Sequence, residues 1–330
     1  MRKGLLTAAV LASSALVLTG CATVEAPPNE SGAGSQGTDY PTKPISLVVA
    51  WSAGGGTDIM SRAYAQGAKE HLGQTMNVVN KPGGSGAVGW GEIAHSTEPD
   101  GYTLSIVSPE IGFLREQGLY DFGLEDFTLI TLINEDSAVL AVPADAKWNT
   151  LDDFIKDAKA NPDTISIGNS GPGLVWDLAT TAIERAADIT LTHVPYDGAA
   201  GAVQAVLGGS IGGMTFSLGE VSSQVKAGDM KILAIAGDER NESFPDVPTF
   251  DELGYDVKIG TFRGIAGPAG MDPAVVSKLN EAFVKMAEEE TFTSVMNNNN
   301  FGIRVMPTDE FNDFFGDASE LYKSLLEPSK

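Results

Sequence analysis

The residues best suited to chemistry lie in three glycine-rich segments, each placed directly after a run of apolar and β-branched residues. These are Ser52-Ala53-Gly54-Gly55-Gly56-Thr57-Asp58, Gly83-Gly84-Ser85-Gly86 and Asn169-Ser170-Gly171-Pro172-Gly173. Glycine leaves backbone N–H groups uncovered, and the first amides of a following helix lack internal partners while its dipole favours anions. Each segment can therefore bind a carboxylate or phosphate, or be a tight turn that binds nothing. Three such segments predict a cleft lined with backbone donors.

Other chemistries find little support. The first segment does not follow the Gly-x-Gly-x-x-Gly spacing of a dinucleotide site, and Glu70, the nearest acid at a suitable distance, lies in a predicted helix. His71, His95 and His193 are the only histidines, and each has a neighbourhood typical of a helix surface, helix end or strand end. We expect a binding protein that is not an enzyme, with no cofactor, no metal and no catalytic residues.

Two charged residues near these segments need separate interpretation. Arg263 lies in an apolar stretch, where its guanidinium could grip a ligand carboxylate in a bidentate way or pair with one of the many acids. Asp58 is expected to be an acceptor that ties loop amides at the start of a helix, because a carboxylate there would repel an anionic ligand. Arg62, one turn further on, could pair with it.

An alternation of strands and helices must position these segments. Apolar runs followed by helical spacing favour an α/β fold with a mostly parallel sheet covered on both faces. Asn149 or Thr150 can cap one helix, and Asp272 with Pro273 another. We predict strands over 45–51, 76–80, 102–107, 137–142, 164–168, 190–194 and 232–236, and helices ending near 72, beginning near 150 and after 173, and spanning 199–207, 273–290 and 309–326.

The N-terminus predicts export. Arg2 and Lys3 precede an apolar run over 5–18 that is too short for a membrane span and ends in Leu-Thr-Gly before Cys21. Cys21 is the only cysteine, so no intramolecular disulfide can form. It resembles the lipidated cysteine of bacterial lipoproteins, which implies a signal peptide over 1–21 and a lipid anchor. The alternative is a chance cysteine in a signal peptide cleaved elsewhere. Residues 22–39 have the composition of a flexible tether.

The formal charge of −23 excludes the basic surface that nucleic-acid binding requires and argues against docking on anionic lipid. Acidity of this degree indicates solubility. It does not prevent anion binding, because two charges 20 Å apart in water interact by only about 0.2 kcal/mol before screening. A charge-assisted hydrogen bond contributes about 1.5 to 3 kcal/mol.

A series of short motifs in fixed order resembles the Bug-type substrate-binding proteins of tripartite tricarboxylate transporters. The resemblance covers roughly residues 40–325. Its motifs are Tyr40-Pro-x-Lys-Pro-Ile45, Gly54-Gly55-x-x-Asp58-x-x-x-Arg62, Asn80-Lys-Pro-Gly83-x-x-Gly86-x-x-Gly89, Pro99-Asp-Gly-Tyr-Thr-Leu104, His193-Val-Pro-Tyr196-x-Gly198, Gly208-Gly209 and Pro245-Asp-Val-Pro-Thr249.

The resemblance implies a two-lobed periplasmic-binding-protein type II fold with the ligand cleft between lobes. Lobe 1 would comprise 40–140 and 256–330, and lobe 2 would comprise 141–255. It further implies a monomer that captures a small organic carboxylate for membrane permease subunits. Phe262-Arg263-Gly264 and the first glycine segment favour a tricarboxylate such as citrate. A sensor subunit for a membrane signalling protein, or less readily an exported enzyme, remains the alternative.

The chain departs from the family pattern at two places. Ala50-Trp51-Ser52-Ala53 replaces a proline and aromatic pattern, and Trp176 or Asp177 stands where a histidine is often found. With the resemblance included, the candidate ligand-binding residues are Ser52, Ala53, Gly54, Gly55, Gly56, Thr57, Asp58, Gly83, Gly84, Ser85, Asn169, Ser170, Gly171, Asp197 and Arg263.

Overall fold

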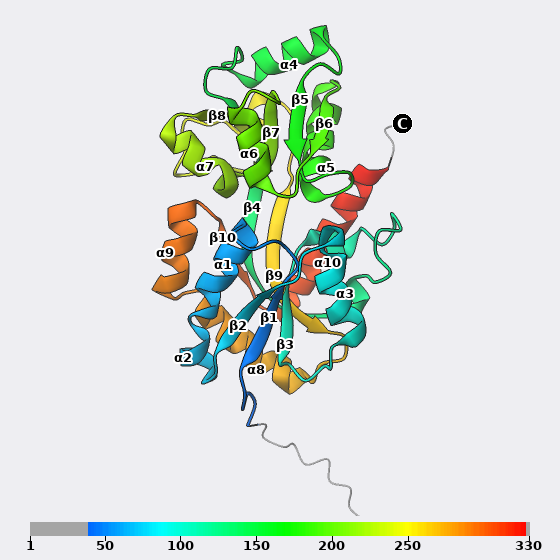
Figure 1. The fold of residues 1–330 in the computed structure, drawn as a ribbon, viewed down its shortest axis with the longest axis vertical. Coiled ribbons are helices and arrows are strands. Elements are labelled where there is room, and N and C mark those ends of the chain that lie inside the picture. Colours follow the sequence, from blue (N-terminus) through cyan, green and yellow to red (C-terminus); the bar gives the residue numbers. More distant parts are fainter. Residues whose placement is uncertain (1–38, 328–330) are drawn as a thin grey trace, which may run out of the picture. The chain divides into compact units, whose positions relative to one another are not determined.

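The computed structural model describes residues 39–327. The predicted signal peptide, the lipidation at Cys21 and nearly all of the predicted tether lie outside the described residues. Figure 1 shows the elements of the described part, in which strands β4 and β9 run between two groups of helices and strands. We refer to these groups as lobe 1 and lobe 2.

Lobe 1 combines elements from both ends of the described chain, because the segment after residue 259 returns to it. Its 3₁₀ turns are η1 (Gly84–Gly86), η2 (Pro109–Gly112) and η3 (Leu124–Asp126). Its other elements are β1 (Ile45–Val49), α1 (Gly56–Ala65), α2 (Ala68–Leu72), β2 (Met76–Asn80), α3 (Ala87–Ser96), β3 (Thr103–Val107), β9 (Gly260–Pro268), α8 (Pro273–Met286), α9 (Glu290–Asn299), β10 (Ile303–Met306) and α10 (Thr308–Leu326).

Lobe 2 is built from the middle of the chain, and it is joined to lobe 1 by the long strand β4 (Phe127–Pro143). A 3₁₀ turn, η4 (Asp251–Leu253), precedes the return. The remaining elements are α4 (Leu151–Ala160), β5 (Ser166–Asn169), α5 (Val175–Ala187), β6 (Thr192–Pro195), α6 (Ala199–Leu207), β7 (Gly213–Ser217), α7 (Leu218–Ala227) and β8 (Met230–Ile235).

The sheet is mixed, which corrects the prediction of a mostly parallel one. β1 pairs in parallel with β2 and β3, and β5 pairs in parallel with β6 and β7. The strands that cross between lobes run the other way: β9 is antiparallel to β3, and β4 is antiparallel to β7, β8, β9 and β10. The physical reason is that β4 carries the chain from lobe 1 into lobe 2 and β9 carries it back, so the two crossing strands run in opposite directions.

Strand β4 belongs to both lobes. Its first part, from Phe127 to Ser137, pairs with β9, and its last part, from Ala138 to Pro143, pairs with β7 and β8. Strand β4 therefore connects the two lobes, because it forms backbone hydrogen bonds in both of them.

Most of the predicted helix starts are confirmed, because the capping residues form the expected bonds. Thr150 accepts the amide of Asp153 and forms a capping box at α4, and Asp272 accepts the amide of Ala274 at α8. Helix α6 has the predicted bounds. The sequence-based interpretation did not predict α3, β7, α7, β9, α9 and β10.

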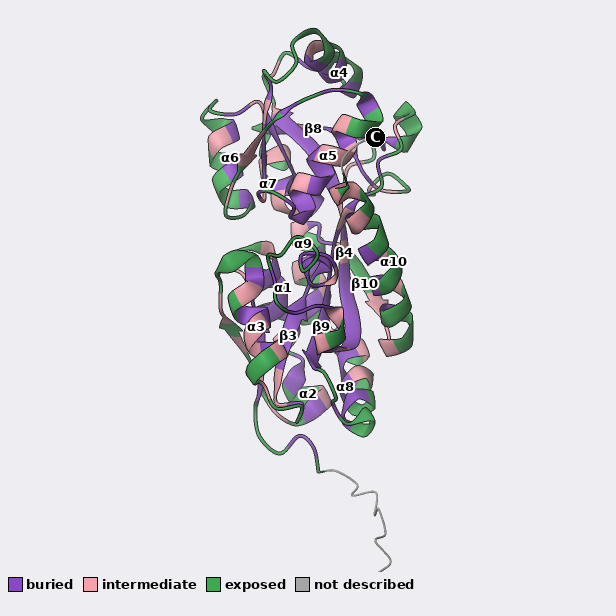
Figure 2. Cartoon of the chain, turned by 90° about the vertical axis from the view of Figure 1, so that its right-hand side faces the viewer, coloured by how far each residue is buried: buried purple, intermediate pink, exposed green. Residues whose placement is uncertain are grey.

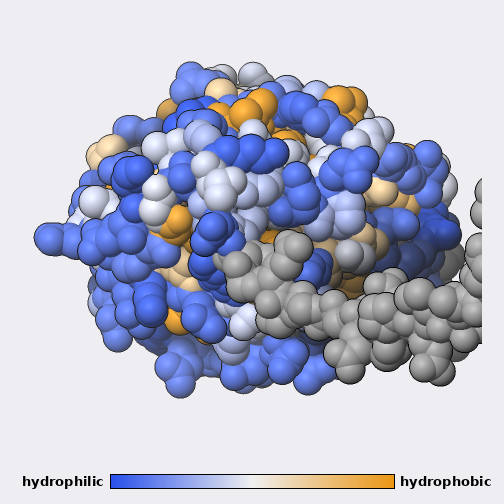
Figure 3. Space-filling model, turned by 90° about the horizontal axis from the view of Figure 1, so that it is seen from below, coloured by the Kyte–Doolittle hydropathy of each residue, from blue (hydrophilic) through white to orange (hydrophobic). Residues whose placement is uncertain are grey.

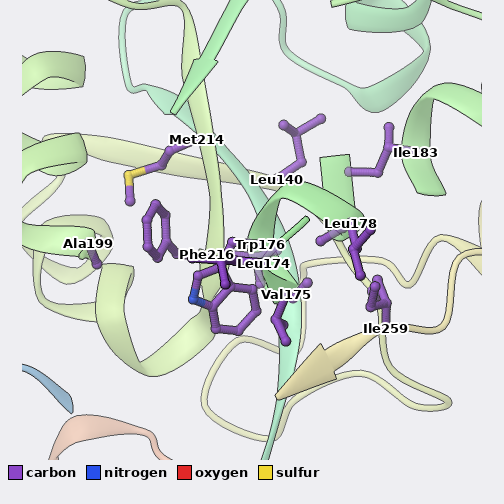
Figure 4. Close-up of a cluster of buried hydrophobic side chains, with 14 of the residues drawn as sticks. Leu140, Leu174, Val175, Trp176, Leu178, Ile183, Ala199, Met214, Phe216 and Ile259 are labelled. Carbon is purple, nitrogen blue, oxygen red and sulfur yellow. The ribbon is translucent and has the colours of Figure 1, made fainter. Parts of the chain in front are cut away.

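The core lies along the strands, whose residues are mostly buried, while the outer faces of helices such as α10 are exposed (Figure 2). In lobe 2, Trp176 and Phe216 have ring centroids 5.8 Å apart and pack among buried aliphatic side chains (Figure 4). This packing places the first turn of α5 against β7. The face of the molecule seen in Figure 3 is predominantly hydrophilic, and its apolar side chains lie in small separate areas.

None of the helices within residues 39–327 combines the length and apolar character that crossing a bilayer requires.

Candidate functional site

A cavity of about 310 Å³ lies where loops of the two lobes meet. It brings together four of the candidate residues. Ser85 comes from lobe 1, and the other lining residues come from lobe 2: Ser170, Gly171, Pro172, Leu174, Pro195, Tyr196 and Asp197.

Three helices begin at this cavity. Ser85 lies just before α3, Leu174 is the N-cap of α5, and Asp197 precedes Gly198, the N-cap of α6. None of the three N-caps is satisfied by a side-chain hydrogen bond. The positive ends of three helix dipoles therefore converge on one space, which suits an anion. Some of the first-turn amides are already used: Val88 of α3 donates to the Gly83 carbonyl at 3.3 Å, and Trp176 of α5 donates to Ser170 Oγ at 3.2 Å.

The first glycine segment is held from below by Asp58, as predicted. Asp58, only 4% exposed, accepts the amide of Gly54 at 2.9 Å and the side-chain amide of Asn80 at 2.9 Å. Arg62 completes the set, with Nε 3.1 Å from Asp58 Oδ2. Burial alone would raise the pKa of Asp58, but the bonds from Arg62, Gly54 and Asn80 outweigh it and lower the pKa. The structure thus confirms Asp58 as a structural acceptor and Arg62 as its partner.

With Asp58 turned inward, the top of the segment is open to solvent. The residues Ser52, Ala53, Gly54 and Gly55 are exposed, and Gly54 has φ +85°, a conformation that favours glycine. Gly83 and Gly84 are also exposed and have positive φ angles. These stretches lie outside the lining of the cavity.

Asn169 is placed beneath the third segment and is fully buried. Its Oδ1 accepts the amide of Gly171 at 3.0 Å, and its Nδ2 donates to Asp177 Oδ1 at 3.0 Å. Asp177 also accepts the amide of Gly173 at 2.9 Å. Asn169 and Asp177 therefore shape the loop that carries Ser170 to the cavity.

His193 is locked between two carboxylates of α5. Its Nδ1 lies 2.5 Å from Asp177 Oδ1 and its Nε2 lies 3.1 Å from Glu184 Oε2. Hydrogen bonds to Asp177 and Glu184 raise the pKa of His193 to about 9, although burial opposes the rise. The charged imidazole ties β6, which leads to Tyr196 and Asp197, to α5. The sequence indicated only that His193 lies at the end of a strand, and it did not predict the pairing with two carboxylates.

Arg263 forms an ion pair, the second of its two predicted interpretations. Its side chain is 7% exposed; Nη1 lies 2.8 Å from Asp136 Oδ2 and 2.6 Å from Asn134 Oδ1. Its Nε donates to Thr57 Oγ1 at 2.9 Å. Arg263 therefore joins β9 and β4 to the first turn of α1, and Thr57 is used in that link.

Three polar residues that sequence reasoning missed lie near the junction of the lobes. Glu110, 5% exposed, accepts the Ser108 hydroxyl at 2.5 Å; burial raises its pKa, and the α5 amide of Val175 is among the groups that oppose the rise. Glu220 forms a capping box with Ser217 at the start of α7. Asn300 is the C-cap of α9. Only the Ser-x-x-Glu pattern of Ser217 and Glu220 gave a readable signal.

One other cluster could in principle hold a metal ion. Ligand atoms of Glu70, His71 and Glu289 lie within 4.8 Å of one another, and His71 Nε2 is 2.7 Å from Glu289 Oε1. The group lies on α2 and at the N-cap of α9, and none of its residues lines the cavity. The hydrogen bond between His71 and Glu289 accounts for their closeness.

Comparison with known proteins adds to this geometry. A family model described as the tripartite tricarboxylate transporter family receptor matches residues 60–329. Protein BugT of Bordetella pertussis is 30% identical over 264 residues, which cover 77% of this chain and 81% of BugT. A TctC solute-binding protein from Polaromonas is 36% identical with a TM-score of 0.72, over 87% of this chain and 99% of that chain. MatC of Rhodopseudomonas palustris, solved with bound malate, is 23% identical with a TM-score of 0.78 over 87% of this chain and all of MatC (100%), a likeness in fold.

Proposed function

We propose that this chain, which belongs to the tripartite tricarboxylate transporter receptor family, is an exported solute-binding protein that captures a small organic carboxylate between its lobes. The observation that carries the proposal is the convergence of the amino ends of α3, α5 and α6 on one cavity lined from both lobes. Amides fixed by the fold need no reorganisation to receive an anion.

The backbone donors supply the binding energy. Two or three charge-assisted hydrogen bonds, each about 1.5 to 3 kcal/mol, exceed the diffuse repulsion from the remote acids. The first glycine segment, with Gly55 and Gly56 at the start of α1, is proposed to contribute further amides. The malate held by MatC is a ligand of the class proposed here. The sequence-based expectation of a tricarboxylate such as citrate belongs to the same class.

Capture would be followed by delivery to membrane permease subunits. Two-lobed binding proteins commonly close about their crossing strands when a ligand binds. We expect the permease to recognise the closed form. Lipidation of Cys21 would keep the protein at the membrane. Mass spectrometry of the N-terminal peptide of the membrane-bound protein should show an acylated Cys21 as its first residue, and an unmodified Cys21 would contradict the anchor.

Binding can be tested by thermal shift with mono-, di- and tricarboxylates, each paired with its uncharged amide. We expect at least one acid to stabilise the protein, by about 2.7 kcal/mol at a hundredfold excess over Kd, and no amide to do so. If no acid binds, the proposed function is wrong. Delivery is tested separately by uptake into membranes that contain the permease, where unchanged uptake without this protein would reject the role.

A further inference from the structure

A second cavity, of about 320 Å³, lies at the hinge where the chain crosses between the lobes. Its walls are residues 135–137 of β4, 236–238 after β8, 258–262 at the return crossing and one face of α10. We call it the hinge cavity. It shares no lining residue with the cavity of the candidate site, and a molecule within it would touch both lobes.

The hinge cavity and the first glycine segment lie on opposite faces of β9. Successive side chains of a strand alternate between its two faces. Phe262 packs against Phe315 of α10, with ring centroids 4.8 Å apart, whereas the next residue, Arg263, donates to Thr57 of α1. A change in the angle between the lobes would therefore change the width of the hinge cavity.

Helix α10 gives the hinge cavity an apolar wall. Phe314, Ala318 and Leu321 lie on one face of the helix, because residues three and four apart are neighbours. Leu321 is 44% exposed, and Phe314 and Ala318 are half-buried. The packing of the lobes leaves this apolar surface uncovered, and the volume of the cavity falls within the range of small-molecule sites.

Asp317 adds a negative charge to this wall. It is exposed and stands between Phe314 and Leu321 on the cavity face of α10. The other acids of the lining have basic partners, in the pairs Glu135–Arg304, Asp136–Arg263 and Asp238–Lys258. No ion pair within residues 39–327 involves Asp317. The hinge cavity therefore combines an apolar wall with a carboxylate that has no counter-charge in the described part of the chain.

An existing contact shows that this surface suits a cation. The Arg304 guanidinium lies 4.7 Å from the centroid of the Phe314 ring while it pairs with Glu135. The negative face of an aromatic ring attracts a cation. An anion, by contrast, would be repelled by Asp317 and by the exposed Asp313 one turn before it. The wall and its charge together favour a ligand with an apolar body and a positive group.

We propose that the hinge cavity is a second ligand site, which takes an organic cation with a compact apolar body, such as an aryl- or alkylammonium. The ammonium would pair with Asp317, and the apolar body would cover Phe314, Ala318 and Leu321. Because this ligand differs in charge from the carboxylate expected in the cleft, the two would not compete for one site.

Occupation of the hinge cavity should act on the lobes. The lobes are in contact on the opposite face, where the Phe301 ring lies against Gly56 of lobe 1 and Gly219 of lobe 2. Helix α10 is also tied to lobe 2, since Arg185 of α5 donates to the Leu325 carbonyl at 2.9 Å (Figure 1). A molecule that fits the cavity at this width favours this arrangement of the lobes over an open one. We expect it to strengthen carboxylate binding, and this part alone rests on the proposed capture of carboxylates.

Titration calorimetry in the absence of any carboxylate tests the site. The probes are 2-phenylethylammonium, the neutral 2-phenylethanol and the ammonium ion. We expect 2-phenylethylammonium to bind at least tenfold more tightly than 2-phenylethanol, and the ammonium ion not to bind. Equal binding of the alcohol, or no binding of 2-phenylethylammonium, would overturn the site. Neither result would bear on carboxylate capture.

Asp317→Asn removes the charge and keeps the shape of the side chain. We expect the affinity for 2-phenylethylammonium to fall at least tenfold, with an unchanged melting temperature because Asp317 is exposed. Asp313→Asn is the matched control, because Asp313 is an exposed acid of the same helix that does not line the cavity. Equal affinities in the two variants would show that the cation binds elsewhere and would overturn the proposal.

Leu321→Ser tests the apolar wall. We expect the affinity for 2-phenylethylammonium to fall at least threefold, because part of the surface that covers its ring is lost. Leu253→Ser is the control, since Leu253 is also exposed (36%) and lies outside the cavity. An unchanged affinity in Leu321→Ser would exclude the α10 wall from the site.

The coupling between the two sites is measured by titrating the best carboxylate with and without saturating 2-phenylethylammonium. We expect the carboxylate to bind at least threefold more tightly in its presence, and the reverse titration to give the same factor by linkage. Unchanged or weaker carboxylate binding would overturn the coupling. If no carboxylate binds in either titration, the proposed function fails instead.

Discussion

Asp58 in lobe 1 and Asp177 in lobe 2 hold equivalent places, since each accepts at 2.9 Å the amide of the glycine four residues before it. In both cases the glycine belongs to the loop that leads into a helix, and the carboxylate lies beneath that loop. The two lobes therefore fix the loop before a helix in the same way, with a carboxylate that accepts a glycine amide. Asp177 does so while also pairing with His193.

Asp58→Asn should weaken both the fold and ligand capture. The change removes the charge that holds the Gly54 amide and Arg62, and loss of a charge-assisted bond at a buried site costs about 1 to 3 kcal/mol. Denaturant unfolding should show a loss in this range, and calorimetry with the best carboxylate should show at least tenfold weaker binding. Asp153→Asn, at an exposed capping position, is the control; equal affinity in both variants would mean that Asp58 does not position the loop.

The stability of lobe 2 should depend on pH through His193. Its folded pKa of about 9 lies above the ordinary 6.5, so its contribution is complete below pH 6.5 and disappears as the pH rises through about 9. For a partly exposed side chain we expect a contribution of about 2 kcal/mol. Urea unfolding of the protein and of His193→Gln should differ at pH 6 and converge near pH 10. A constant difference across this range would contradict the pairing with Asp177 and Glu184.

Arg263→Met should be strongly destabilising, because it leaves the Asp136 carboxylate buried without a counter-charge. Breaking a buried pair at one partner costs about 3 to 5 kcal/mol. Adding Asp136→Asn to Arg263→Met should recover part of this loss in thermal unfolding. If the single variant unfolds like the parent protein, the ion pair does not hold β4 against β9.

Gly55→Val should abolish ligand binding and leave the fold intact. Gly55 has an ordinary φ of −78°, and a Cβ there would meet only the Ser52 carbonyl oxygen, at 3.6 Å, so the side chain fits but covers the loop amides. We expect a melting temperature close to that of the parent and no shift with carboxylates. Gly316→Val, at an open position of α10, is the control. A normal ligand-induced shift in Gly55→Val would remove the first glycine segment from the site.

The local elements could be predicted from sequence, since hydrophobic period, glycine and capping residues act over a few neighbouring positions. Strand β2, helix α6 and the Thr150 cap follow such patterns. The bond between Asp58 and Arg62 was predictable for the same reason, because residues four apart on a helix are neighbours.

The tertiary structure decided which residues from distant segments contact one another. The partners of Arg263 come from residues 57, 134 and 136, and the antiparallel direction of β4 and β9 follows from two crossings that no local pattern encodes. Glu220 read alone is a capping residue, and Asn300 is one of four consecutive asparagines. The proximity of Glu220 to Gly56 depends on the packing of one lobe against the other. The sequence by itself therefore determined which loops offer backbone donors, and only the fold decided which charges stand beside them, because contacts between residues far apart in the chain are set by packing and not by local conformational preference.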